Sequence, residues 1–406
     1  MVLGALLFAS NAARADLYSC PAGSIQWTGN AHDGNWNNAG NWKPRKVPGP
    51  TSDVCIPTFT TADGAGLNGS KPSISVHSIT VDTGGGLIFG SGTVSIATSL
   101  NNQGLTSLYG TTLSAGSIEM PNPGEIDVFD NTSITSPAFS NTTGTLWVYP
   151  TGTLRLADNP VQLQNGNLSG GNWLVSGALI FPSDISQITA EPGAAYATVV
   201  SVDLDATFQD ASGHNPLATL TSVGSDTVLD VPALTLDHDL TSQGTVSVGT
   251  LTINGTYTLE SGATAESSSL TATSVDVQSG ALLGGGTVAS SITNSGTVEV
   301  SGTLTVTHNY TQTGSGALTE LFGSTLHVNS NATLSGALNV QVNPKHPPTS
   351  GRDLHRAYGR LAQRLVHESH SGVRADYQRE QHPGDKAISG GAARSWTPWR
   401  HKGGGA

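Results

Sequence analysis

The sequence has little of what long helices and membrane spans require. Only 11% of its 406 residues are charged, 6% are aromatic and two are Met. Outside the carboxyl-terminal tail, no segment shows the 3.6-residue rhythm of helix-forming residues. No run approaches the ~20 apolar residues that cross a bilayer. A G-x-S-x-G elbow, a P-loop and an H-E-x-x-H motif are also missing, which argues against an α/β hydrolase.

What the sequence does contain is short β-forming runs between small-residue turns. Residues 294–342, NSGTVEVSGTLTVTHNYTQTGSGALTELFGSTLHVNSNATLSGALNVQV, show this pattern most regularly. From Ser73 onward similar runs recur about every 8 to 12 residues, and a chain this long favours a stack of repeats over a single sandwich. We therefore predict an all-β parallel β-solenoid over residues 73–343, with about 11 to 14 turns of roughly 20 to 25 residues.

The first residues predict export. An apolar stretch ends in Ala13-Arg14-Ala15, which fits a cleavage site, so residues 1–15 are interpreted as a signal peptide. A basic segment before the apolar stretch is missing, and an apolar β-strand is the alternative. In an oxidising compartment Cys20 and Cys55 are expected to form a disulfide, with two free thiols as the alternative.

Residues 16–72 differ from the repeats by their Trp content. Trp27, Trp36 and Trp42 lie among Asn, Gly and Pro. Large rings over the first turn would close an open core and cover unpaired strand edges, which predicts an amino-terminal aromatic cap. The same rings are carbohydrate-binding candidates, because sugars stack their C–H faces on aromatic planes.

The repeat loosens over residues 190–239, and this region contains the best acidic candidates for a site. If Asp203 and Asp205 lie in a strand, they project on one face about 7 Å apart. With Asp210 and His214 they are candidate catalytic residues for polysaccharide cleavage, and Asp237 and Asp239 are candidate Ca²⁺ ligands. The alternative is an ordinary solvated acidic face. Repeated Thr suggests an outward ladder, but its spacing along the sequence is irregular.

Charge separates the body from the tail. Up to residue 343 the chain has six Lys and Arg, and the other eleven of the 17 lie in the last 63 residues. An acidic body repels phosphate backbones, so nucleic-acid binding is not expected. Residues 344–406 are either a basic appendage that binds a polyanion or the product of a reading-frame slip, because a one-base shift permits strand-like sequence. The second interpretation is preferred, and the tail is expected to be out of frame or disordered; the appendage alternative would include a short helix over residues 354–367.

Two segments resemble a known class of proteins. Residues 284–342, beginning GGGTVASSITNSGTVEV, resemble the β-strand repeats of bacterial secreted and outer-surface proteins, including autotransporter passenger-like adhesins. The segment GNWNNAGNWKPRKVPGPTSDVCIP resembles the stretch that often precedes such repeats. The resemblance covers about residues 27–342 and implies a right-handed parallel β-helix, export and an adhesive surface role. It implies no catalytic residue, and it gives no support for autotransport itself.

The expected function is a non-enzymatic secreted or cell-surface repeat protein with an adhesive or matrix role. Its partners would be an extracellular polysaccharide or a cell-surface ligand, bound through many weak contacts along a repetitive surface. No cofactor is expected, apart from a possible Ca²⁺. The alternative is a polysaccharide hydrolase or lyase of the pectate-lyase-like architecture, which requires the acidic residues to converge in one groove.

Overall fold

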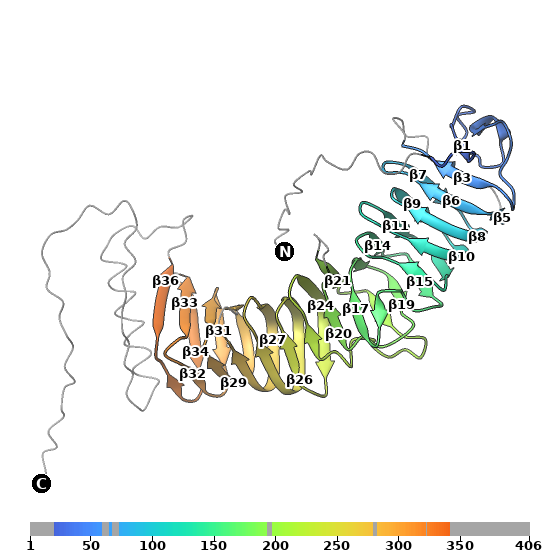
Figure 1. Cartoon of the computed structure of the whole chain (residues 1–406). Coiled ribbons are helices and arrows are strands. Elements are labelled where there is room, and N and C mark those ends of the chain that lie inside the picture. The colour runs from blue at the N-terminus through green and yellow to red at the C-terminus, as the bar shows by residue number, and fades with distance from the viewer. Residues whose placement is uncertain are drawn as a thin grey trace, which may run out of the picture.

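The computed structural model of the chain is a parallel β-solenoid of about 13 turns, with 56% of its residues in strands (Figure 1). The structure describes residues 20–58, 65–66, 73–192, 197–278, 282–321 and 323–341. Within these ranges the helical content is one 3-10 turn, Ala39–Asn41, and no helix is long and apolar enough to span a membrane. The predicted signal peptide and the tail at 344–406 lie outside the described residues. The solenoid and its number of turns are confirmed.

Each regular turn contributes strand segments to three faces. In the amino-terminal turns, the first face is built by β5 (Ser73–Val76), the first part of β8 (Gly92–Asn102) and of β10 (Thr111–Glu119), β12 (Asn131–Thr135), β15 (Thr153–Leu156), β19 (Ala178–Ile180) and β22 (Thr207–Gln209). The second face contains β1 (Ile25–Trp27), β3 (Asp53–Ile56), β6 (Ser78–Val81), the last parts of β8 and β10, and β13 (Phe139–Ser140). The third face contains β4 (Ala65–Gly66), β7 (Gly86–Phe89), β9 (Leu105–Leu108), β11 (Glu125–Val128), β14 (Thr145–Val148), β18 (Asn172–Val175) and β21 (Thr198–Val202).

The carboxyl-terminal turns continue the same faces with longer strands. The long strands β24 (Thr227–Leu236), β26 (Thr245–Leu259), β27 (Thr264–Val277) and β29 (Gly286–Asn294) each cross from one face to the next. Shorter strands complete the turns: β20 (Gln187–Thr189), β23 (Ser222–Val223), β25 (Leu240–Ser242), β28 (Leu282–Leu283), β30 (Thr297–Val300), β31 (Thr303–Val306), β32 (Tyr310–Gln312), β33 (Ala317–Leu321), β34 (Thr325–Val328), β35 (Ala332–Thr333) and β36 (Ala337–Gln341).

Inward positions form one continuous apolar core, because alternate residues of a strand point to opposite sides of the sheet. In β7, Leu87 and Phe89 are fully buried whereas Ile88 between them is 39% exposed. Buried amides fix the corners: the side chain of Asn294 donates to the carbonyl oxygen of Ala317 at 2.9 Å. Gly occupies the corner position before several third-face strands, namely β7, β9, β11, β14 and β18. A Cβ at Gly124 would collide with the carbonyl oxygen of Asn102, and this close approach explains part of the high Gly content.

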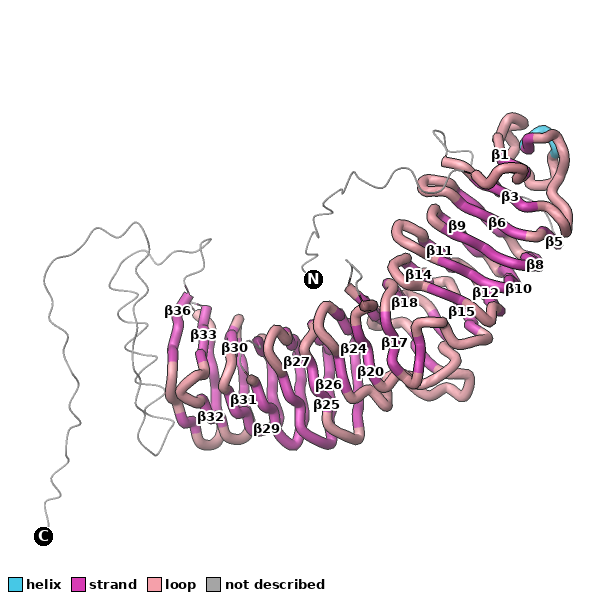
Figure 2. Tube along the Cα trace, in the orientation of Figure 1, coloured by secondary structure: helices cyan, strands magenta, loops and turns pink. Residues whose placement is uncertain are grey.

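The middle of the solenoid departs from the regular repeat. Paired residues on the third face are 20 positions apart between Glu125 and Thr145 but 29 apart between Val199 and Val228. An antiparallel hairpin, β16 (Leu163–Gln164) and β17 (Asn167–Ser169), interrupts the second face. The stack changes direction in this region (Figure 1), and Figure 2 shows loops gathered beside β17 and β20. The loosening expected over residues 190–239 is therefore confirmed, although it begins earlier, near the hairpin.

The Trp-rich segment is a cap whose rings are buried. Trp42 makes edge contacts with Trp27 and Trp36, at centroid distances of 4.9 and 4.7 Å. Each of the three rings is only 1% exposed. The prediction of a cap is supported, but the proposal that these rings stack on sugars is wrong, because the protein already covers their faces. The segment also joins the solenoid earlier than expected, since β3 pairs in parallel with β6.

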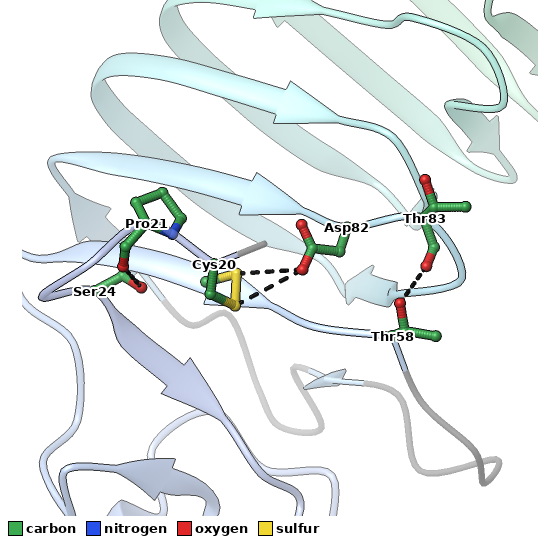
Figure 3. Close-up of a disulfide and its surroundings, with 7 residues drawn as sticks. Cys20, Pro21, Ser24, Thr58, Asp82 and Thr83 are labelled. Carbon is green, nitrogen blue, oxygen red and sulfur yellow. Dashed lines mark hydrogen bonds between the residues drawn. A yellow bond between two sulfur atoms is a disulfide. The ribbon is translucent and has the colours of Figure 1, made fainter. Parts of the chain in front are cut away.

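The predicted disulfide between Cys20 and Cys55 is confirmed, with a Cα–Cα distance of 5.6 Å. It ties the residue where the described chain begins to β3 in the first turns (Figure 3). The carboxyl oxygen Oδ2 of Asp82 lies 3.8 and 3.9 Å from the two sulfur atoms. Asp82 is buried, and desolvation raises the pKa of its carboxyl group. The bridge therefore fastens the cap to the stack.

Candidate functional site

The acidic residues chosen from the sequence do not form the expected strand site. Strand β21 ends at Val202, so Asp203 and Asp205 lie in the turn that follows it, and both are exposed. The prediction that they project from a strand on one face is wrong. The turn begins there because the third-face strand ends after its last core residue, and the chain must then bend toward β22.

Asp210 and His214 hold their own loop together. The carboxylate of Asp210 accepts hydrogen bonds from the backbone N–H groups of Ser212 and His214 at 2.7 and 2.8 Å. These bonds, led by the one from His214, lower the pKa of Asp210. The His214 ring nitrogen Nδ1 lies 3.4 Å from the same carboxylate. This is the pattern of a loop-capping Asp, whose hydrogen bonds are satisfied locally.

Asp237 and Asp239 bind the neighbouring turn. Asp237 accepts from the side chain of Asn254 at 2.9 Å, and Asp239 accepts from the backbone N–H of Thr256 at 2.7 Å. Across the described ranges, the group of three potential metal ligands is Cys20, Cys55 and Asp82. Both of those sulfurs are in the disulfide, so that group offers a single carboxylate.

A different surface lies on the outer side of the third face, where β7, β9, β11 and β14 run side by side. Equivalent outward positions on these strands form three rows across the stack. The first row is Gly86, Leu105, Glu125 and Thr145, and the second is Ile88, Ser107, Asp127 and Trp147. The third follows the strand ends and contains Gly90, Tyr109, Phe129 and Tyr149. We call this area the aromatic–acidic surface.

Four rings of this surface form one continuous stack. Tyr109 and Phe129 are stacked at a centroid distance of 4.6 Å, and Phe129 and Tyr149 at 4.3 Å. Trp147 stacks on Tyr149 at 4.4 Å. Parallel strands place equivalent side chains about 4.8 Å apart, which is also a favourable spacing for stacked rings. The repeat of the fold therefore aligns the rings without further constraint.

One end of the stack is open. The hydrogen bond from the backbone N–H of Tyr109 to the carbonyl oxygen of Phe89 places Gly90 in register with Tyr109. Gly90 has no side chain to cover the ring, and Tyr109 is 37% exposed. Ile88 and Leu105, each 39% exposed, lie on the same surface. Exposed large apolar side chains are thus concentrated beside the open ring.

A carboxyl pair lies next to the rings. Asp127 is only 6% exposed, and its carboxyl group is within hydrogen-bonding reach of Glu125 and of the Tyr149 hydroxyl. Desolvation, followed by the charge of Glu125, raises the pKa of Asp127 to about 7. Burial also raises the pKa of Tyr149, with a further contribution from the charge of Asp127. Asp127 is therefore partly protonated near neutral pH.

A polar pocket lies at the hairpin in the middle of the solenoid. It has a volume of about 360 Å³ and is lined by Ser140, Thr142, Val161, Gln162, Gln164, Asn167, Ser169, Thr189, Glu191 and Pro192. Much of its lining is already hydrogen-bonded internally: Ser169 donates to Glu191 at 2.9 Å, and Asn167 donates to Thr189 at 3.0 Å. The pocket arises because the hairpin displaces the second-face ladder.

The aromatic–acidic surface was not predicted from the sequence, although the spacing of its aromatic residues indicates it. Tyr109, Phe129 and Tyr149 are each 20 residues apart and each follow a β-forming run. A search for aromatic residues at the period of one turn would have found them. Comparisons with protein-family models, curated proteins and solved structures gave no significant match. Function must therefore be inferred from the chemistry of the surface itself.

Proposed function

We propose that this protein is an extracellular glycan-binding repeat protein with an adhesive or matrix role, and that the aromatic–acidic surface binds the glycan. The observation that carries the proposal is the open face of Tyr109 at the end of a preorganised ring stack. Sugar rings present apolar C–H faces that pack on aromatic planes, and their hydroxyl groups donate to carboxylates such as Glu125.

Two further features support the proposal: the disulfide supports an extracellular location, and the rigid ring stack supports binding. The Cys20–Cys55 disulfide is of a kind that persists in oxidising compartments. A rigid ring stack also lowers the entropy lost on binding, because Phe129 and Tyr149 already hold their neighbours in place. Adhesion through a solenoid needs only modest affinity at one site when several molecules present it together.

The same geometry gives less support to an enzyme. Glycoside hydrolysis requires two carboxyl groups about 5 to 9.5 Å apart, with the sugar between them. Glu125 and Asp127 lie two residues apart on β11 and interact directly, and Asp127 is buried, so the pair offers no open space for a sugar between its members. The acids of the turn after β21 are exposed and, in the case of Asp210, bound to their own loop. Binding without cleavage is therefore the proposed activity.

The test is glycan binding by the full chain and by Tyr109→Ala, measured on a glycan array and then by isothermal titration calorimetry. We expect Tyr109→Ala to weaken binding at least about fivefold, because a stacked ring contributes on the order of 1 kcal/mol or more. His327→Ala removes an exposed ring from β34 on the first face and is the matched control. Equal affinities of Tyr109→Ala and the unmodified protein would refute the proposal.

A further inference from the structure

The carboxyl pair of the aromatic–acidic surface has an unused acceptor. Oδ1 of Asp127 is buried and, among the described residues, has no hydrogen-bond partner. An unsatisfied buried acceptor is costly, and the cost is removed when a ligand donates to it. Asp127 itself is 94% buried but borders the exposed side chains of the surface. The arrangement therefore indicates a ligand that donates hydrogen bonds to this carboxyl group.

Among the residues that the structure describes, the strands around the pair carry only acidic or neutral side chains. The five strands β7, β9, β11, β14 and β18, together with the residue after each, contain no Lys, Arg or His. The titratable groups that interact with Asp127 are Glu125 on its own strand and Tyr149 after β14, and Tyr149 in turn interacts with Tyr109. A glycan carrying carboxylate or sulfate groups would add like charge to this surface, which is unfavourable.

The aromatic rings favour a positive charge at the same place. The π-electron faces of Tyr, Phe and Trp attract ammonium groups, and the attraction grows as water is excluded. Tyr149 contacts Asp127 through its hydroxyl group while its ring is stacked between Phe129 and Trp147. Both faces of the Tyr149 ring are therefore covered, so an ammonium group at Asp127 would meet carboxyl oxygens there, and the open aromatic plane on the same surface is the outer face of Tyr109.

We propose that the surface recognises an amino sugar, with the ammonium group donating to Glu125 and Asp127 and the C–H face of the sugar ring packed on Tyr109. This inference rests on the proposed glycan-binding function and specifies its ligand class. Binding is non-covalent: the ammonium group takes the place of the proton on the Asp127 carboxyl group, and that proton passes to solvent.

The pH dependence follows from this exchange. Since the pKa of Asp127 is about 7, lowering the pH protonates the pair and a proton competes with the ligand. Affinity should fall by up to about tenfold per pH unit below pH 7. A neutral sugar that only stacks on Tyr109 releases no proton and should bind with little pH dependence.

The experiment compares β-1,4-linked glucosamine oligomers with the same oligomers N-acetylated, by isothermal titration calorimetry on the full chain at pH 7 and pH 5.5. We expect the glucosamine oligomer to bind at least tenfold more tightly at pH 7, with proton release. Asp127→Asn keeps the shape of the side chain and should abolish this preference, so that the two oligomers bind with similar affinity. Glu125→Gln, at a more exposed position, provides the same test if Asp127→Asn does not fold.

Equal affinities for the two oligomers, or tighter binding of a uronate oligomer, would overturn the inference. So would binding of Ca²⁺ at the pair, detected by terbium luminescence sensitised by Trp147, without any preference among sugars. The proposed function is judged separately. If neutral oligomers bind in a Tyr109-dependent way, glycan binding stands and only the amino-sugar inference fails, whereas loss of all Tyr109-dependent binding removes both.

Discussion

The two ends of the solenoid are built on the same kind of core but carry different side chains on their outer surfaces. The amino-terminal stack (residues 25–209) and the carboxyl-terminal stack (residues 222–341) both bury alternate aliphatic residues in a continuous core. Every ring–ring contact between described residues lies between Trp27 and Phe208. In the carboxyl-terminal stack the described aromatic residues, Tyr257 and Tyr310, are buried. The two stacks thus share their architecture, whereas the stacked rings of the candidate binding surface lie in the amino-terminal stack.

The outer surface of the carboxyl-terminal stack is dominated by Thr and Ser. On its second face, equivalent outward positions on consecutive turns form a ladder of Thr241, Thr258, Asp276, Thr293, Thr311 and Thr333. β-branched Thr favours the strand conformation and keeps the surface polar. This surface extends the rod without offering an aromatic plane, whereas the amino-terminal stack carries the rings on which the proposed glycan binding depends.

The largest expected effect comes from breaking the cap. Trp42→Ala removes a fully buried ring that contacts Trp27 and Trp36, and its indole N–H donates to the carbonyl oxygen of Trp36 at 2.7 Å. We expect a loss of about 3 to 5 kcal/mol in the free energy of unfolding. Because each turn contacts mainly its neighbours, hydrogen exchange should accelerate in the amino-terminal stack and stay unchanged in the carboxyl-terminal stack.

The control for this variant is Trp42→Phe, which keeps an aromatic ring and should show a smaller effect. Hydrogen exchange followed by mass spectrometry reads both stacks in one experiment. Uniform acceleration along the whole rod would show that the two stacks unfold as one unit. The amino-terminal and carboxyl-terminal stacks would then differ only in their outer surfaces.

The second prediction removes the covalent tie between the cap and the stack. Replacing both Cys20 and Cys55 with Ser opens a loop with a sequence separation of 35 residues. The chain-entropy model predicts a loss of about 3 to 4 kcal/mol. Urea unfolding of the variant should match that of the reduced unmodified protein. Identical stability of the oxidised and reduced forms would contradict a stabilising role for the bridge.

The third prediction tests a buried acid in the carboxyl-terminal stack. Glu320 occupies an inward position in register with Val300 and Val340 and is 2% exposed. Desolvation raises the pKa of Glu320 to about 7 from 4.5. The protonated form therefore stabilises the fold fully below pH 4.5, and this contribution is lost as the pH rises through about 7.

Glu320→Gln should remove that pH dependence. Its stability, measured by urea unfolding between pH 5 and pH 8, should be nearly flat where the unmodified protein loses on the order of 3 kcal/mol. Asp127 is the corresponding acid of the amino-terminal stack, so both proteins are compared in an Asp127→Asn background to isolate the effect. Parallel pH profiles for the two proteins would show that Glu320 is not protonated in the fold.

The sequence predicts the inside of this protein better than its outside. Alternation in runs such as residues 297–300 indicates which side chains face the core, and the turn residues set the length of each repeat. Two Cys residues leave one possible intramolecular pairing. The burial of Trp27 was not predictable, since Trp in an Asn- and Gly-rich segment suits either a cap or a sugar site.

The candidate site depends on register, which single strands do not encode. Asp127 meets Tyr149 only because consecutive turns place them side by side, 22 positions apart in the sequence. Thr258 and Thr293 align for the same reason, although the intervening loops make their sequence spacing look irregular. Asp203 was misplaced because the end of β21 depends on where the coil turns, and the local sequence around it is compatible with strand.

The smallest expected effect on stability tests whether the ring stack exists for binding. Phe129 lies between Tyr109 and Tyr149, so Phe129→Leu keeps an apolar side chain but breaks the stack. Stacked pairs contribute about 0.5 to 1.5 kcal/mol each beyond burial, so unfolding should be destabilised by only about 1 to 2 kcal/mol. If the stack preorganises Tyr109, glycan affinity should fall by a comparable free energy, about tenfold, while the amino-sugar preference set by Glu125 and Asp127 persists. A variant that loses stability without losing affinity would show that Phe129 contributes to folding only and not to binding. The ring stack would then be a structural counterpart of the Thr ladder, and the two stacks would differ only in the open ring of Tyr109 and the carboxyl pair of Glu125 and Asp127.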